Sequence, residues 1–170
     1  MDKKVFGITG LSGSGKTTLI AKLVDWFCQR GLKVSTLKHT HHGFDLDSPG
    51  KDSWRMREAG AQEVFLVSNK RLVLLQEFRD STEPTVAELV ARLQPCDLVL
   101  VEGYKRDPLP KIEVHRPSLG NPPVWPSNAS VVAVAVDAAT ETHLPLLDLN
   151  DTDAIARFIT RHVGLEMDAL

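Results

Sequence analysis

The sequence predicts an α/β protein, a three-layer sandwich whose sheet is mostly parallel and partly mixed. Short, apolar, β-prone runs alternate with helical patterns, as in chains that place helices on both faces of a parallel sheet. A glycine-rich segment follows the first run and precedes a helical pattern. The run 96–103, CDLVLVEG, is apolar enough for a strand that is buried on both faces at the centre of the sheet.

The first elements follow from local pattern. Residues 4–9, KVFGIT, form a short apolar run that ends at glycine and predict a buried parallel strand. A helix follows, because apolar residues from Leu19 to Cys28 recur at helical spacing and Gly31 stands where a helix stop belongs. The run 32–40 predicts the next strand.

The middle of the chain predicts a helix and two adjacent strands. Ser48 and Pro49 are typical of a helix cap and a first helical position, so we expect a helix from there to about residue 59. Runs 63–69 and 71–78 predict strands with no helix between them. Part of the sheet should therefore be antiparallel.

The last part of the chain continues the alternation and also contains a proline-rich stretch. The expected elements are a helix at 85–94, strands at 96–103, 111–116, 130–137 and 144–149, and a helix at 151–163 capped by Asp151 or Thr152. Residues 108–126 hold six of the ten prolines, and we interpret them as an exposed arm.

Size and charge limit the classes of function. A chain of 170 residues predicts one domain over 1–170. A formal net charge of -2 gives no general electrostatic attraction to nucleic acid or to an anionic membrane. The apolar run at the start of the chain is too short for a signal peptide and no run is long enough to span a membrane, so we expect a cytoplasmic protein.

A phosphate-binding loop is the clearest functional motif. Residues 10–17 fit G-x4-G-K-[ST] and lie between a predicted strand and a predicted helix. Glycines let the backbone approach a polyphosphate, and the helix N-terminus adds partial positive charge. Lys16 should bridge β- and γ-phosphates, and the Thr17 hydroxyl should ligate Mg²⁺. The candidate nucleotide-binding residues here are Gly10, Ser12, Gly13, Ser14, Gly15, Lys16 and Thr17.

Two glutamates end predicted strands and are candidates for the metal. Glu102 ends the apolar run DLVLVE, which puts its carboxylate in the position of an acid that serves Mg²⁺. Capping or a salt bridge is the alternative role. Glu77 ends a similar run and could be a second, outer carboxylate. Lys16 and Glu102 are the candidate catalytic residues.

The identity of the base is weakly encoded. Asp137 ends the run SVVAVAVD at the carboxyl end of a predicted strand, where ligands of open α/β sheets bind. It could contact the base or simply form a turn.

The segment 37–55, LKHTHHGFDLDSPGKDSWR, concentrates three histidines, three aspartates, two lysines and an arginine. It should emerge from a strand at the same sheet edge as the phosphate-binding loop, so it could bind anionic oxygens or sense the nucleotide. A transition-metal site and a solvated loop are the alternatives. The candidate ligand-binding residues in the segment are His39, His41, His42, Asp45, Lys51 and Asp52.

Together these motifs resemble the molybdopterin-guanine dinucleotide biosynthesis protein B family (MobB). The resemblance rests on SGSGKTTL, the segment from Leu37 to Ala61, DLVLVEGYK followed by KIEV, and LLDLND, and it extends over nearly the whole chain. It implies a P-loop protein that binds GTP and Mg²⁺, has weak GTPase activity and forms a homodimer. It also implies that Thr18 helps to hold phosphates or Mg²⁺, and that Glu77 and Glu102 serve the metal. The implied partners are molybdopterin guanylyltransferase and other molybdenum cofactor proteins.

Three functions remain open at this point. The first is a GTP-binding adaptor in cofactor assembly whose hydrolysis is slow. The second is a small-molecule kinase or ATP-dependent ligase, in which His41, His42 and Asp45 bind the acceptor and lid cations come from Arg106, Lys111 or Arg116. The third is a nucleotide sensor that does not hydrolyse its ligand.

Overall fold

The computed structural model describes residues 3–40 and 43–166. The chain divides into two compact units: unit 1 comprises Met1–His39 and Val86–Leu170, and unit 2 comprises Thr40–Thr85. The expectation of one domain over 1–170 stays a prediction, because compactness does not show whether either unit folds alone. Within the described residues, no helix combines the length and the apolar character needed to cross a membrane.

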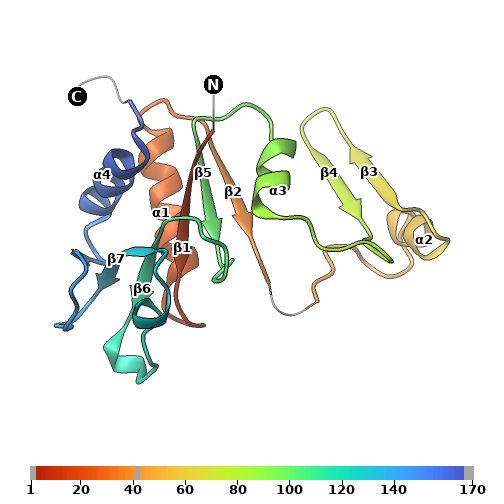
Figure 1. Ribbon diagram of the computed structural model, residues 1–170. Coiled ribbons are helices and arrows are strands. Elements are labelled where there is room, and N and C mark those ends of the chain that lie inside the picture. The colour runs from red at the N-terminus through yellow and green to blue at the C-terminus, as the bar shows by residue number, and fades with distance from the viewer. Residues whose placement is uncertain (1–2, 41–42, 167–170) are drawn as a thin grey trace. The chain divides into compact units, whose positions relative to one another are not determined.

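Unit 1 is built on a six-stranded sheet in which all neighbouring strands run parallel, in the order β2-β5-β1-β6-β7-β8 (Figure 1). The strands are β1 (Lys4–Thr9), β2 (Val34–Lys38), β5 (Leu98–Glu102), β6 (Lys111–His115), β7 (Val131–Val136) and β8 (Leu146–Asp148). All five residues of β5 are buried, which confirms the interior position predicted for the run 96–103.

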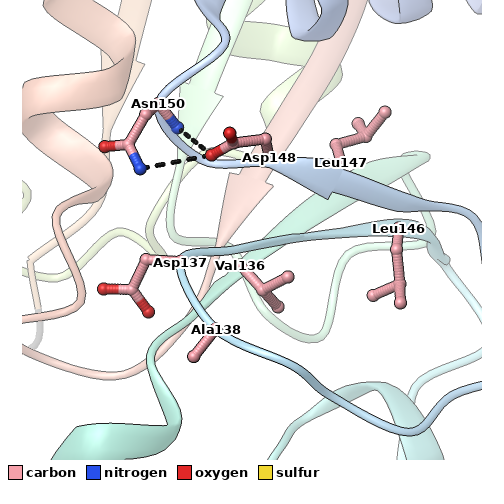
Figure 2. Close-up of a pocket in the computed structure, with 7 residues that line it drawn as sticks. All are labelled: Val136, Asp137, Ala138, Leu146, Leu147, Asp148 and Asn150. Atoms are coloured by element: carbon pink, nitrogen blue, oxygen red, sulfur yellow. Dashed lines mark hydrogen bonds between the residues drawn. The ribbon is translucent and has the colours of Figure 1, made fainter.

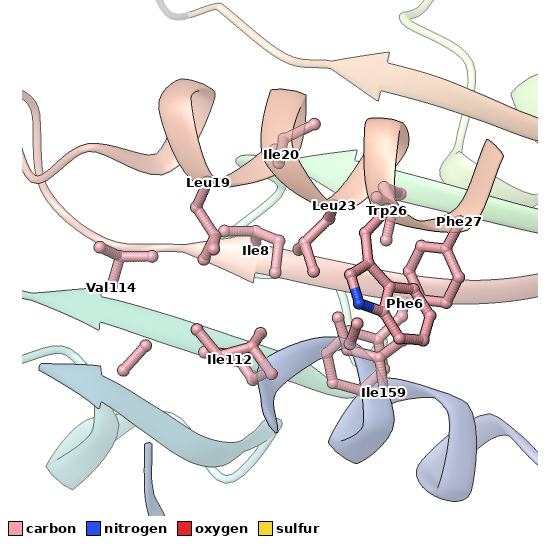
Figure 3. Packing of buried hydrophobic residues seen from close by; sticks show 14 of the residues in the cluster. Phe6, Ile8, Leu19, Ile20, Leu23, Trp26, Phe27, Ile112, Val114 and Ile159 are labelled. Atoms are coloured by element: carbon pink, nitrogen blue, oxygen red, sulfur yellow. The ribbon is translucent and has the colours of Figure 1, made fainter. Parts of the chain in front are cut away.

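Helices cover both faces of this sheet and make the expected three layers. On one face, α1 (Lys16–Cys28) packs beside α4 (Thr152–Val163) over a core of aromatic and aliphatic side chains (Figure 3). On the other face, α3 (Val86–Arg92) packs against β5. The Asp151 carboxylate accepts a hydrogen bond from Ala154 N at 2.9 Å, so Asp151 is the predicted cap of the last helix.

The proline-rich stretch 108–126 is only in part the exposed arm that we expected. Strand β6, which confirms the strand predicted at 111–116, lies inside it between β1 and β7 and is buried from Lys111 to Val114. The prolines flank this strand and do not interrupt it, so its hydrogen-bond ladder survives. After β6 come two short 3-10 turns, Pro117–Leu119 and Trp125–Ser127.

Unit 2 contains α2 (Asp52–Glu58) and an antiparallel pair, β3 (Glu63–Val67) and β4 (Leu72–Gln76). The predicted antiparallel pairing is therefore present, but in a two-stranded sheet of its own. The prediction that a helix begins at Ser48–Pro49 is wrong. Gly50 has a left-handed φ of 85°, which breaks a helix at that point, and α2 begins only at Asp52.

Candidate functional site

The phosphate-binding loop connects β1 to α1, as the motif predicts. Gly10 adopts a φ of 134°, and a Cβ atom there would collide with the carbonyl oxygen of Val114 in β6. Only glycine lets the loop leave the sheet so close to the neighbouring strand. The loop closes on itself, because Ser14 N donates to Leu11 O at 3.3 Å. This hydrogen bond within the loop helps to hold its backbone in a closed turn.

Lys16 is the first residue of α1 and its side chain turns back over the loop. Its Nζ donates to the carbonyl oxygen of Leu11 at 2.8 Å. Burial lowers the pKa of Lys16, Glu102 raises it, and the positive charges of Lys105 and Lys38 lower it further. The lysine therefore lies in a partly desolvated cluster of cations, where an anionic ligand would relieve the mutual repulsion.

Thr17 and Glu102 meet at the carboxyl end of β5. Thr17 Oγ1 donates to the Glu102 carboxylate, with distances of 3.1 Å to Oε1 and 3.0 Å to Oε2. Glu102 is 8% exposed, although Thr17 itself is exposed. The parallel register explains the encounter, since Ile8 of β1 pairs with Glu102 just ahead of the loop. A hydroxyl and a carboxylate side by side are oxygen donors of the kind that Mg²⁺ prefers, so these residues fit that ion.

Lys38, the last residue of β2, completes this group of polar atoms. Its Nζ lies 3.2 Å from Thr17 Oγ1 and 3.3 Å from Glu102 Oε1. Sequence reasoning considered lysines in the segment 37–55 but did not name this one. The signal was present, because Lys38 ends a predicted parallel strand at the same edge as Glu102.

His39 lies directly behind the same strand end. The backbone N–H of His39 donates to the carbonyl oxygen of Glu102 at 3.0 Å, and the imidazole ring centroid lies 4.8 Å from that of the Tyr104 ring. Tyr104 has a positive φ of 44°, which is uncommon for a bulky residue. Lys111 Nζ donates to Tyr104 O at 3.0 Å and thereby helps to hold this turn. His39 thus adjoins the turn that follows Glu102.

Lys111 is fully buried, which rules out the role of lid cation that the kinase alternative gave it. Its Nζ donates to the carbonyl oxygens of Tyr104 and Asp107, the latter at 2.6 Å, and burial lowers its pKa. Lys111 anchors the turn after β5. Arg106 in that turn is exposed.

Arg116 joins the phosphate-binding loop to Asp137. Its Nε donates to the carbonyl oxygen of Ser14 at 2.9 Å, and its Nη1 forms an ion pair with the Asp137 carboxylate. Sequence reasoning placed Arg116 only among possible lid cations. The same rule that identified Asp137 could have found it, because Arg116 immediately follows a buried parallel strand.

Asp137 lines a pocket of about 300 Å³ at the carboxyl ends of β7 and β8 (Figure 2). Val136 and Leu146 line it with apolar surface, and Asp148 and Asn150 contribute polar groups. Asn150 N donates to Asp148 Oδ1 at 2.8 Å. The volume is at the lower end of the range for small-molecule sites, so one heterocyclic ring would fit. That Asp137 contacts a base stays a prediction.

The other candidate residues belong to unit 2, where Arg57 gathers the carboxylates. Arg57 Nη1 lies 2.8 Å from Asp45 Oδ1 and 3.4 Å from Asp47 Oδ2, and its Nε donates to Glu77 Oε1 at 2.8 Å. Lys51 and Asp52 are exposed at the start of α2. The parts of Asp45, Lys51, Asp52 and Glu77 in nucleotide or metal binding stay predictions.

Two further metal questions concern the histidines. His41 and His42 lie outside the described residues. Among residues 3–40 and 43–166, no three His, Cys, Asp or Glu side chains converge as they would for a transition-metal site.

The phosphate-loop residues Ser12, Gly13 and Thr18 are exposed, whereas Ser14 is buried at 2% exposure.

Comparisons with known proteins find similar proteins over most of the chain. Residues 5–137 match the family model described as MobB, Molybdopterin guanine dinucleotide synthesis protein B. The chain is 42% identical to a molybdopterin-guanine dinucleotide biosynthesis adapter protein of Haemophilus influenzae, over 91% of this chain and 86% of that protein. It is 40% identical to the protein of the same name in Escherichia coli, over 87% of this chain and 86% of that protein. The crystal structure of Bacillus subtilis MobB superposes with a TM-score of 0.75 at 22% identity, over 96% of this chain and 99% of that one, which shows the shared fold.

Proposed function

Because the chain belongs to the MobB family, we propose that it is an adapter protein of molybdopterin guanine dinucleotide biosynthesis that binds GTP with Mg²⁺. The observation that best supports nucleotide binding is the hydrogen bond from the Thr17 hydroxyl to the Glu102 carboxylate, beside Lys16. Backbone N–H groups and Lys16 would hold the phosphates, and Thr17 with Glu102 would hold the metal directly or through water. The metal would neutralise phosphate charge.

The base would enter the pocket beside Asp137. A carboxylate that accepts from ring and exocyclic N–H groups favours guanine, which offers these donors, over adenine. The apolar surface of Val136 and Leu146 would contact the face or edge of the ring. This placement supports GTP as the nucleotide.

Hydrolysis by the chain alone should be slow. The Glu102 carboxylate already accepts a hydrogen bond from the Thr17 hydroxyl and pairs with Lys38, so its oxygens are occupied and Glu102 is not positioned to take a proton from an attacking water. Arg116 is held by Ser14 O and Asp137. A GTPase that must gain its catalytic groups from a partner turns over slowly by itself. We therefore expect weak GTPase activity and a role in presenting nucleotide to a molybdopterin guanylyltransferase.

Unit 2 supports the further proposal of a homodimer. Phe65 pairs with Leu74 across the two strands and Val67 pairs with Leu72, so these four side chains share one face. They are exposed at 57%, 39%, 71% and 59%. A two-stranded sheet with an uncovered apolar face is marginal in water and gains stability when a second copy covers it. Val67→Glu should yield monomers in sedimentation equilibrium, whereas Leu119→Glu, which alters an exposed residue of unit 1, should not. A monomeric wild-type chain would refute the dimer.

Calorimetric titration tests the nucleotide proposal directly. GTP and ATP are titrated into the protein with Mg²⁺, first alone and then with the molybdopterin guanylyltransferase present. We expect GTP to bind more tightly than ATP, and phosphate release to be slow without the partner. Rapid phosphoryl transfer from ATP to a small acceptor in the absence of any partner would instead support the kinase alternative.

A further inference from the structure

Lys38 occupies a particular place with respect to the two groups proposed to serve the metal. Its Nζ lies within 3.3 Å of Glu102 Oε1 and within 3.2 Å of Thr17 Oγ1. The Lys38 side chain is 52% exposed, whereas that of Glu102 is 10% exposed. An ammonium group therefore reaches in from solvent and bridges a hydroxyl and a nearly buried carboxylate.

An ammonium group and a divalent cation would bind the same oxygen atoms of Thr17 and Glu102. Both are positive and both bind oxygen, so the carboxylate cannot serve them fully at the same time. Two such cations this close together repel each other, and the repulsion is stronger at a partly buried position than in bulk water. The Lys16 charge lies in the same cluster and adds to the repulsion. One of the two cations must withdraw.

We propose that the Lys38 ammonium competes with Mg²⁺ for the Thr17–Glu102 pair, so that metal binding displaces the Lys38 side chain toward solvent. The backbone of Lys38 stays in place during this exchange. Lys38 pairs with Glu102 in the parallel ladder, and the next residue donates its N–H to Glu102 O at 3.0 Å. Only the flexible stem of the lysine has to move.

The exchange gives Lys38 a defined task. It neutralises Glu102 when no metal is bound, which avoids an unpaired carboxylate at a nearly buried position. It also raises the metal concentration needed for binding, because the metal has to displace an ion pair. Lys38 is thus a positioning residue that tunes metal affinity. The nucleotide part of this inference rests on the proposed function, but the competition for metal can be measured without nucleotide.

The test is a titration of Mn²⁺ into nucleotide-free protein, with free Mn²⁺ measured by electron paramagnetic resonance. Lys38→Met should bind Mn²⁺ about two- to fivefold more tightly than wild type, since it no longer has to displace a largely exposed ion pair. Lys38→Arg restores a competing cation and should return to the wild-type affinity. Lys22→Met removes the same charge from an exposed position of α1 and should leave the affinity unchanged.

A second measurement follows the lysine itself. The side-chain Nζ signal of Lys38, assigned through its loss in Lys38→Met, should shift when Mg²⁺ is added to wild type. The signal should also shift in Glu102→Gln without any metal. The inference would be overturned if Lys38→Met bound Mn²⁺ no more tightly than wild type, or if no variant bound Mn²⁺. It would also be overturned if the Lys38 Nζ signal did not shift when Mg²⁺ is added.

The two proposals fail in different ways. If GTP does not bind to wild type with Mg²⁺, the nucleotide function is wrong, while tighter Mn²⁺ binding by Lys38→Met still supports the competition. If GTP binds with Mg²⁺ but Lys38→Met shows no gain in Mn²⁺ affinity, the nucleotide function stands and the competition is refuted.

Discussion

Arg116 Nε donates to the carbonyl oxygen of Ser14 at 2.9 Å, and so links the end of β6 to the phosphate-binding loop. The same guanidinium pairs with Asp137 at the end of β7. Its Nη2 would lie 3.6 Å from a Cβ atom on Gly15, so it lies close against the loop backbone. One side chain therefore connects the proposed phosphate and base subsites, and its loss should affect both.

Replacing Arg116 with methionine should weaken GTP binding about three- to tenfold. The variant keeps much of the apolar stem but loses the hydrogen bond to Ser14 O and the ion pair, so the loop is less well organised before binding. Calorimetry with Mg²⁺ gives the affinity. Arg161→Met, at an exposed position of α4, is the matched control and should bind as wild type does. Equal affinities in the two variants would show that Arg116 does not support the loop.

Features formed by residues close together in the sequence could be predicted from it, whereas contacts between distant residues generally could not. The phosphate-binding loop was predictable because it closes within eight consecutive residues, 10–17. The contact between Thr17 and Glu102 was also predictable. Glu102 ends one parallel strand and Thr17 lies in the helix that follows another, and the carboxyl ends of parallel strands lie at the same edge of the sheet. The Arg116–Ser14 contact joins residues 102 positions apart and requires that β6 neighbour β1, which no local pattern specifies.

The same reasoning explains the errors. A helix was expected at Ser48–Pro49 because these residues are good start signals, but the left-handed Gly50 lies just after them. A strand was expected at 111–116, but the whole stretch 108–126 was also interpreted as an exposed arm because prolines usually avoid central strands. The short proline-free run 111–115 was enough for a buried strand once β1 and β7 lay on either side. Tertiary pairing outweighed composition in this case.

Replacing Lys16 with alanine should lower GTP affinity at least ~10-fold. The change removes charge-assisted hydrogen bonds to phosphate oxygens worth ~1.5–3 kcal/mol each. It also removes the contact from Nζ to Leu11 O that closes the loop. Lys22→Ala in the same helix controls for charge and helix propensity. An unchanged affinity in Lys16→Ala, measured by calorimetry, would refute the assignment of the phosphate site.

Replacing Asp137 with asparagine should narrow the preference for GTP over ATP. The amide offers a donor where guanine N–H groups need an acceptor, so GTP should lose more affinity than ATP does. Because Asp137 also pairs with Arg116, Arg116→Met is the control for indirect effects. That variant loses the same ion pair but keeps the carboxylate, so it should change the ratio of GTP to ATP affinity less than Asp137→Asn does. An unaltered ratio of GTP to ATP affinity in Asp137→Asn would remove this residue from the base subsite.

Replacing Arg57 with methionine should loosen unit 2 alone. Arg57 pairs with Asp45, Asp47 and Glu77, and its hydrogen bond to Asp45 is the main reason that the pKa of Asp45 is lowered. Hydrogen exchange should become faster across residues 43–85 and stay unchanged in β1 and β5. Arg55→Met, an exposed neighbour on α2, should leave exchange as in wild type.

The pH dependence of that effect has a definite sign. Since the folded pKa of Asp45 lies below the ordinary value of 3.8, its stabilising contribution is present above that value and is lost as the pH falls through the folded pKa. Wild-type protection in unit 2 should therefore decrease in acid. In Arg57→Met this part of the acid dependence should be absent, and an identical acid dependence in both proteins would contradict the assignment.

Glu113 should make the chain less stable as the pH rises. Its carboxylate is buried on β6, at 1% exposure, and accepts hydrogen bonds from Val124 N at 2.9 and 3.0 Å and from Trp125 N at 2.7 Å. Burial raises its pKa more than these two N–H groups lower it. The folded chain therefore holds this proton more tightly than the unfolded chain, for which the ordinary value of 4.5 applies.

The stabilising contribution of the protonated Glu113 is fully present below 4.5 and is lost as the pH rises through the higher folded pKa. Glu113→Gln cannot titrate, so the free energy of unfolding of wild type minus that of the variant should decrease over this interval. Urea denaturation at a series of pH values measures the difference, and Glu141→Gln, at an exposed position, controls for general charge effects. A difference that is flat with pH would mean that the hydrogen bonds from Val124 and Trp125 fully compensate the burial of the charge.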